Sequence, residues 1–266
     1  MLSRTLFALL LVLLVLPFPA PAQNNEQLQV GPPTRRAEPP APAASAEELE
    51  KRGDDLRADK DYLDAMDYYE AALRKSPSVS GLYNKIGISQ LMLQRFKDAR
   101  KSFERAIKAD RKYADAYNNL GFVFYQAKNF NKAIKYYDQA ILLKNDSAAF
   151  YNNLGAVYFD KKEFEKAALN YAKALELDPD IFERTSRAGV QVQLHSPEDQ
   201  ARYDYVLAKL YAKRGIADRS LHYLRKAMEE GYKDIGNVYK DSEFTELRKD
   251  PRFAQLMAAK PVAVPQ

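Results

Sequence analysis

The sequence predicts an all-α protein built as an array of similar helical hairpins, and two observations carry this prediction. The phrase YNNLG occurs at 117–121 and at 151–155, and a near copy, YNKIG, occupies 83–87, so the copies are 34 residues apart. Between residues 46 and 181 only two prolines interrupt the chain, and a long stretch with few helix breakers is typical of helix. Repetition at a fixed interval of this length indicates stacked supersecondary units.

The N-terminal residues 1–22 are predicted to be a signal peptide. A single arginine precedes a short apolar run that stops at Pro17, and Ala20 and Ala22 are the small residues of a cleavage site. The run is shorter than the ~20 residues of a spanning helix, so we expect cleavage before Gln23 and a mature chain that does not span a membrane. An uncleaved membrane anchor is the alternative.

The composition narrows the possible functions. The chain has no cysteine, which excludes disulfides, thiolate metal sites, a cysteine nucleophile and a lipidated cysteine, and an exported protein of this kind fits a bacterial periplasm or secretion. The net charge is +5, but the sequence contains no long run of basic residues, so no nucleic-acid partner is expected. No G-x-S-x-G, H-E-x-x-H or phosphate-loop motif is present. We therefore expect no enzyme activity, no cofactor and no metal, leaving an enzyme with an unrecognised site as a minor alternative.

Residues 23–45 are rich in proline and alanine and are predicted to be an extended linker. From residue 46 the interval of 34 residues defines four units, each with glycine at position 8, alanine at positions 20 and 27 and an aromatic residue at position 24. The units are 46–79, 80–113, 114–147 and 148–181; their glycines are Gly53, Gly87, Gly121 and Gly155, and their aromatic residues are Tyr69, Phe103, Tyr137 and Tyr171.

The small residues at fixed positions predict a close contact between the two helices of each unit. At ~100° per residue, positions 4, 7, 8 and 11 lie on one stripe of the first helix. Because one unit cannot bury this stripe alone, neighbouring units must stack.

These motifs resemble the tetratricopeptide repeat, whose signature contains W-x2-L-G-x2-Y followed by A-x3-F and P. The matching residues are Tyr83, Ile86, Gly87, Tyr117, Leu120, Gly121, Phe124, Tyr151, Leu154, Gly155 and Tyr158. The resemblance implies a right-handed α-solenoid of stacked helix-turn-helix repeats, whose first helices line a concave groove that holds extended peptides.

The C-terminal third is less regular. Residues 182–200 are predicted to be an irregular insert, 201–234 a degenerate fifth repeat, 235–260 a C-terminal helical cap and 261–266 a tail. Within the cap, Pro251 follows an aspartate and is expected at the first position of a helix.

The resemblance places the candidate site in the groove, on side chains that point away from the packed stripe. The candidate partner-binding residues are Asn84, Lys85, Asn118, Asn119, Phe122, Tyr125, Asn152, Asn153 and Phe159. Their amides would hold the backbone of a protein or peptide partner, and their rings would bury its side chains.

Two modes of peptide binding known in this family match the residues of this sequence to different extents. The carboxylate clamp of eukaryotic co-chaperones needs Lys and Asn where this chain has Glu50 and Asp54, so it is not expected here. The asparagine ladder of O-linked N-acetylglucosamine transferases is matched by Asn119 and Asn153 but broken by Lys85. These asparagines alternatively follow a common repeat consensus.

We expect a non-enzymatic, exported adaptor; the alternative is an accessory subunit of an envelope enzyme or assembly machine, docked through its convex face or its cap.

Overall fold

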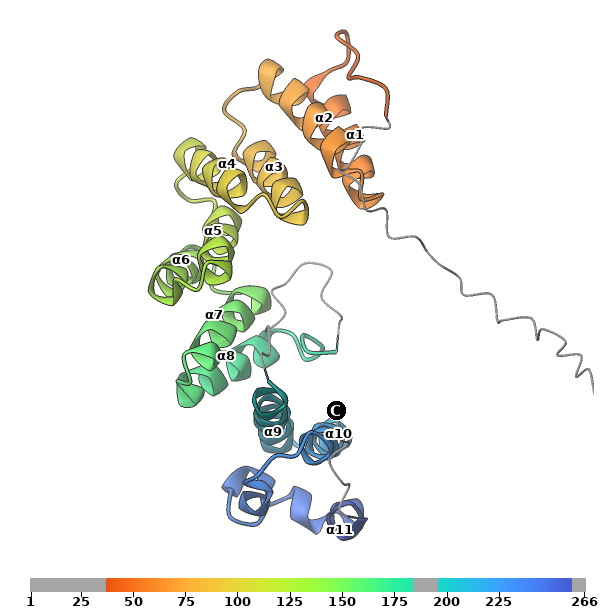
Figure 1. Cartoon of the computed structure of the whole chain (residues 1–266), viewed down its shortest axis with the longest axis vertical. Helices are drawn as coiled ribbons and strands as arrows, with labels where there is room; N and C mark the ends of the chain where they lie inside the picture. The colour runs from red at the N-terminus through yellow and green to blue at the C-terminus, as the bar shows by residue number, and fades with distance from the viewer. Residues whose placement is uncertain (1–36, 184–195, 260–266) are drawn as a thin grey trace, which may run out of the picture. The chain divides into compact units, whose positions relative to one another are not determined.

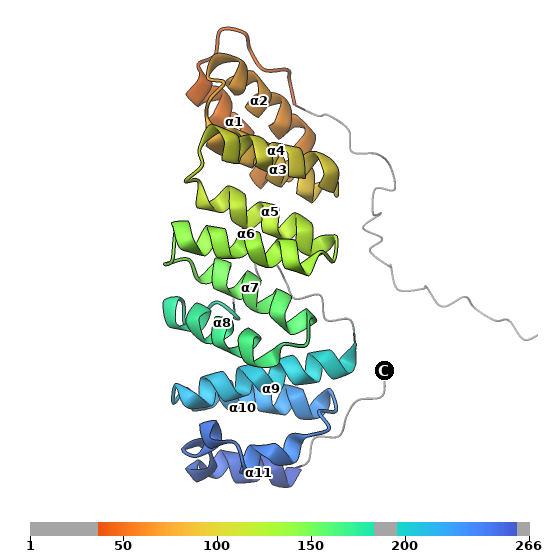
Figure 2. The same cartoon turned by 90° about the vertical axis from the view of Figure 1, so that its left-hand side faces the viewer.

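The computed structural model of the protein describes residues 37–183 and 196–259, and every regular element in those ranges is helical. Figures 1 and 2 show pairs of antiparallel helices that follow one another along the chain. The paired helices are α1 (Ala46–Ala58) with α2 (Tyr62–Lys75), α3 (Ser80–Met92) with α4 (Phe96–Ala109), α5 (Ala114–Gln126) with α6 (Phe130–Leu143), α7 (Ala148–Asp160) with α8 (Phe164–Leu177), and α9 (Pro197–Lys213) with α10 (Ala217–Glu229).

Each hairpin packs on the next in the way that an array requires. The second helix of one hairpin contacts the first helix of the following one, as α2 does with α3 and α4 with α5. The first helices also contact one another directly, α3 with α5 and α5 with α7. The fold class predicted from the sequence, an all-α solenoid of stacked helix-turn-helix repeats, is confirmed.

In the first four hairpins, the repeated glycine of the first helix contacts the repeated aromatic residue of the second helix at very short range. A β-carbon added to Gly87 on α3 would lie 2.5 Å from Cε1 of Phe103 on α4, which is nearer than packed carbon atoms approach. The four aromatic residues at this position are all fully buried. Only glycine therefore lets the second helix place its ring against the backbone of the first.

The turn inside each hairpin has a shared backbone geometry that the repeat pattern did not predict. The second residue after each first helix has a positive φ, and it is glycine only in the fifth hairpin: Lys60, Gln94, Lys128, Lys162 and Gly215. The next residue donates its N–H back into the helix, as Arg95 does to the carbonyl of Gln90 at 2.8 Å. This pattern is a Schellman motif, which satisfies the last carbonyl groups of the helix.

Residues 37–45 pack against α2, which corrects the linker predicted over 23–45. The backbone N–H of Ala37 donates to Asp64 at 3.1 Å, and Tyr68 donates to the carbonyl of Glu38 at 3.1 Å. Lys75 donates to the carbonyl of Pro42 at 2.9 Å, and Ala37 and Ala44 contact the apolar cluster of the first hairpin. Proline-rich composition does not exclude packing where carbonyl groups find donors. The rest of the predicted linker, and the predicted signal peptide, lie outside the described residues.

The C-terminal segment closes the array. It contains η1 (Ile235–Tyr239), η2 (Ser242–Phe244), η3 (Leu247–Lys249) and α11 (Pro251–Ala259), so the helix predicted to begin at Pro251 is confirmed. Val238, Phe244 and Leu247 are buried in one apolar cluster with residues of α9 and α10. The segment therefore covers an apolar surface that a further hairpin would otherwise bury.

The predicted insert at 182–200 is described only in part. Residues 184–195 lie outside the described residues, and α9 begins inside the insert, where Ser196 caps the helix by accepting from the N–H of Asp199. Pro197 occupies the first helical position, which suits its missing N–H and fixed φ.

Candidate partner-binding face

The structure divides the nine predicted site residues into two groups. Lys85, Asn119, Phe122 and Asn152 are partly exposed. The other five are buried: Asn84, Asn118, Tyr125, Asn153 and Phe159. The expectation that all nine side chains are open to a ligand is therefore wrong for these five, because first helices of neighbouring hairpins contact one another more closely than the periodicity of a single hairpin indicates.

The buried asparagines connect three first helices by a chain of amide hydrogen bonds. Asn153 on α7 donates to the side-chain oxygen of Asn118 on α5 at 2.8 Å. Asn118 donates to its neighbour Asn119 at 3.2 Å, and Asn119 donates to Asn84 on α3 at 2.9 Å. Since each amide has two N–H donors and an oxygen with two lone pairs, Asn119 retains hydrogen-bonding capacity on its exposed side.

Lys85 continues this line of contacts toward the first hairpin. Its ammonium group lies 2.7 Å from Glu50 and 2.6 Å from Asp54, both on α1. Burial alone would lower the pKa of Lys85, but its hydrogen bonds to Asp54 and Glu50 outweigh that effect and raise the pKa. Lys85 therefore remains charged at neutral pH, and together with Arg57, which lies 3.8 Å from Asp54, it balances the charge of the acidic pair on α1.

Tyr125 and Phe159 have structural contacts that account for their burial. Tyr125 on α5 donates its hydroxyl to Asp160 on α7 at 2.8 Å. The ring of Phe159 lies edge-on to Phe164 and to Tyr203, with centroid distances of 5.2 and 5.7 Å. Both side chains therefore join neighbouring elements.

The partly exposed side chains form a surface of mixed chemistry, which we call the A-helix face. It consists of Lys85, Ile88, Leu91, Asn119, Phe122 and Asn152, all partly exposed. On an ideal helix their repeat positions fall within about 120° of one another. Ile88, Leu91 and Phe122 also contact the apolar cluster shared by the second, third and fourth hairpins. The face offers amides and one cation beside apolar surface, which suits an extended polypeptide with alternating backbone and side-chain contacts.

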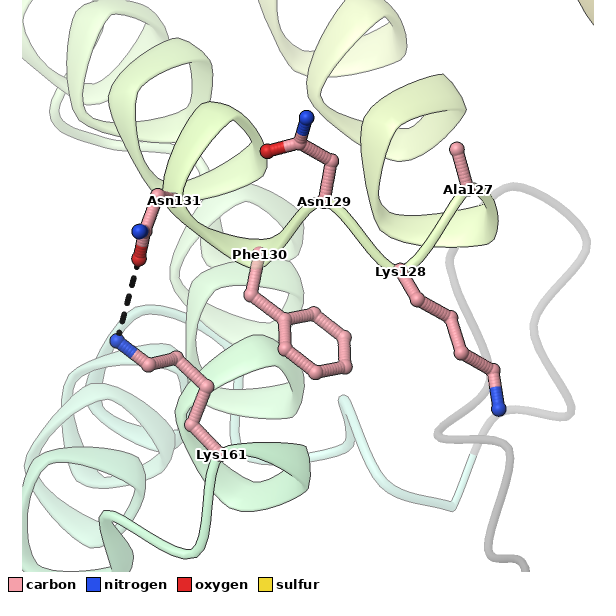
Figure 3. Close-up of a pocket in the computed structure, with 6 residues that line it drawn as sticks. All are labelled: Ala127, Lys128, Asn129, Phe130, Asn131 and Lys161. Carbon is pink, nitrogen blue, oxygen red and sulfur yellow. Dashed lines mark hydrogen bonds between the residues drawn. The ribbon is translucent and has the colours of Figure 1, made fainter.

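A separate depression of about 400 Å³ lies at the turn between α5 and α6. Figure 3 shows the ring of Phe130 between the side chains of Lys128 and Lys161, with Lys161 directed toward Asn131. Lys161 is also paired with Glu163 at 2.8 Å, whereas Lys128 has no ion pair within the described residues. The sequence pattern did not indicate the depression, since its residues belong to two different hairpin turns.

No metal centre is found among the described residues, where no group of three or more His, Cys, Asp or Glu side chains is placed to hold an ion. Over the same ranges, no helix combines the length and the apolar character needed to cross a bilayer.

Comparisons with known proteins agree with the repeat pattern. A family model described as "Tetratricopeptide repeat" matches residues 112–180, and one described as "TPR repeat" matches residues 91–128. A comparison with curated protein sequences gave no significant match.

Several solved structures are similar to this chain. TTC0263, a thermophilic TPR protein of Thermus thermophilus, is 21% identical with a TM-score of 0.49, over 80% of this chain and 100% of that one. MamA is 25% identical with a TM-score of 0.47, over 67% and 93%. YrrB, described as a TPR protein with an unusual peptide-binding site, is 19% identical with a TM-score of 0.47, over 74% and 91%.

Proposed function

Because this chain belongs to the tetratricopeptide repeat family, whose models match within residues 91–180, we propose that it is a protein-interaction scaffold that binds an extended segment of a partner protein along its A-helix face. The observation that carries the proposal is the amide chain from Asn153 to Asn84. It fixes three first helices relative to one another and orients the exposed side of Asn119. A surface prepared in this way loses little side-chain entropy when a ligand binds.

The roles within the proposed site follow from burial. Asn119 and Asn152 contact the partner's backbone, and in the described ranges no hydrogen bond joins the Asn152 amide to another residue. Phe122 and Ile88 contact its apolar side chains. Asn84, Asn118 and Asn153 are positioning residues that act through Asn119, because their side chains are buried.

The test begins by isolating the partner with the full-length protein as bait in an envelope extract, and then measures the dissociation constant of the purified pair. Phe122→Ala should weaken binding about 5- to 30-fold, which is the loss expected for an aromatic anchor of about 1–2 kcal/mol. The matched control is Leu169→Ala on α8, which removes an apolar side chain that is 71% exposed on a second helix. Circular dichroism checks that both variants are folded.

The opposite pattern would contradict the proposal. If Phe122→Ala binds normally while Leu169→Ala or changes in the C-terminal cap weaken binding, the chain docks through another surface. It would then fit the role of an accessory subunit of an envelope enzyme or assembly machine.

We also propose that the chain is exported and acts in the periplasm or outside the cell. The support is the sequence of residues 1–22, with its short apolar run and the small residues Ala20 and Ala22. N-terminal sequencing of the fractionated protein tests this proposal. A mature chain that begins at Gln23 is the expected result, and a chain that keeps Met1 in a membrane fraction would identify an anchor.

A further inference from the structure

The helix α4 carries an excess of cations that neither the fold nor the A-helix face explains. Residues 80–113 contain nine Lys or Arg and three Asp or Glu, a net charge of +6. Six exposed cations of α4 and its flanking turns have no ion-pair partner among the described residues, and we call them the basic strip: Arg95, Lys97, Arg105, Lys108, Arg111 and Lys112.

The cations on the helix itself share one side of it. Counted at ~100° per residue, Lys97, Arg105 and Lys108 fall within about 80° of one another. The acidic residues of this helix are already engaged, since Glu104 accepts from Arg100 at 2.8 Å and Asp98 lies 4.0 Å from Lys101. The outward side of α4 therefore has a net positive charge along its whole length.

The positive surface continues onto the neighbouring helix. The guanidinium of Arg100 on α4 and the ammonium of Lys132 on α6 lie 5.3 and 5.2 Å from the centroid of the same ring, Phe124. Lys135 is also exposed on α6. Cations of two helices thus lie close to the same ring.

The corresponding helix of the fourth hairpin shows that this arrangement is not a general property of the repeat. On α8, Lys166 pairs with Glu163 at 2.6 Å and Lys173 pairs with Glu176 at 2.8 Å. Like charges three or four residues apart destabilise a helix. The unpaired cations of α4 therefore weaken the fold slightly, and a binding role gives a reason for their presence.

Two exposed apolar side chains stand at the N-terminal end of the strip. Met92, the last residue of α3, is 56% exposed, and Phe96, the first residue of α4, is 37% exposed. Arg95 and Lys97 flank Phe96 in the sequence. Exposed apolar side chains beside cations are typical of surfaces that bind the interface of an anionic bilayer.

We propose that the basic strip binds the anionic headgroups of a lipid bilayer, with Met92 and Phe96 entering the interface. Each cation near such a surface gains from its negative potential, and the two apolar side chains leave water. A nucleic acid or an acidic protein would use the cations but would give these side chains no comparable apolar medium.

The experiment measures binding of the full-length protein to vesicles of phosphatidylcholine and to vesicles of an equimolar mixture of phosphatidylcholine and phosphatidylglycerol. Any contribution of the N-terminal apolar run is common to all variants, so the ratio of the two affinities is the readout. We expect the wild type to prefer the anionic vesicles about tenfold or more at low salt, and to lose this preference at high salt.

The strip variant combines Lys97→Glu, Arg105→Glu and Lys108→Glu. The control combines Lys144→Glu, Lys213→Glu and Arg225→Glu, three exposed cations on separate elements, and changes the net charge by the same amount. The strip variant should lose the anionic preference about tenfold, while the control should stay within about threefold of the wild type. If the triple Glu variant fails to fold by circular dichroism, the corresponding Gln variant replaces it.

Three results would overturn the proposal. The first is a wild type that shows no preference for anionic vesicles. The second is a control variant that loses as much of the anionic preference as the strip variant does. Alternatively, duplex DNA or polyglutamate would bind through the strip while vesicles do not, which would assign it to a nucleic acid or to an acidic protein.

Discussion

The contact between Gly87 and Phe103 leaves no room for a β-carbon at position 87, and Gly87→Ala tests this requirement directly. A β-carbon at this position would lie 2.5, 2.8 and 2.8 Å from three ring carbons of Phe103. Favourable carbon contacts begin near ~3.5 Å. Because Phe103 is fully buried, its ring cannot turn into solvent to make room.

The expected magnitude combines two opposing effects. Overpacking of this kind costs about 1–3 kcal/mol, and the short distances favour the upper end. Alanine is a better helix former than glycine by about 1 kcal/mol. The net change in the free energy of unfolding is therefore a loss of about 2 kcal/mol. In a domain of this size that corresponds to a fall in Tm of about 4–8 °C.

The same helix contains a matched control. A β-carbon added to Gly81, in the first turn of α3, meets no heavy atom within 4 Å. Gly81→Ala should therefore be neutral or stabilise the protein by up to about 1 kcal/mol. Gly121→Ala is an intermediate case, since its nearest ring carbons lie at 2.9 Å. Thermal unfolding followed by circular dichroism gives all three values, and a Gly87→Ala protein as stable as the wild type would refute the packing argument.

Three further predictions use features of single side chains. Tyr171→Phe removes a buried hydroxyl that has no hydrogen-bond partner within the described ranges, so the free energy of unfolding should stay the same or rise by up to ~1 kcal/mol. Tyr69→Phe loses a 2.8 Å hydrogen bond to Asp54 and should lower the free energy of unfolding, measured in urea, by about 1 kcal/mol. Gln94→Gly should stabilise the chain by about 0.5–1 kcal/mol, because φ at Gln94 is +57°; an equal or lower urea midpoint would contradict this. Burial raises the pKa of Asp204, with Gln200 and Lys226 opposing that shift. The raised pKa of Asp204 therefore contributes its full stabilisation below the unfolded pKa of about 3.9, and this stabilisation is lost as pH rises through the folded pKa. The stability of Asp204→Asn relative to the wild type should for this reason increase with pH.

Much of the fold could be predicted because its determinants repeat. The small residues at Gly87 and Ala99 and the ring at Phe103 recur every 34 residues, and each describes a contact within one hairpin. The positive φ at Gln94 could not be predicted in this way, because four different hairpins accept a residue other than glycine there. The packing of residues 37–45 on α2 depends on carbonyl groups, which every residue has, and no composition rule identifies their donors.

The candidate site was predictable only to the level of the helix face. Asn153 and Phe159 occupy positions that lie on the exposed arc of a single hairpin, but contacts with the neighbouring hairpin bury them. Sequence periodicity describes one helix at a time. It does not indicate how closely the first helix of the neighbouring hairpin approaches. Phe122 remains partly exposed, although it shares the helix α5 with the buried Tyr125.

The most direct measurement of the central claim is a site-specific cross-link formed in living cells. A photoreactive phenylalanine analogue is placed at Phe122 on the A-helix face, and in a second protein at Leu169, which is 71% exposed on α8. Both positions are accessible, so labelling reports proximity to the partner. The account predicts that the partner is captured from position 122 and not from position 169. Capture from position 169 alone would contradict binding along the A-helix face.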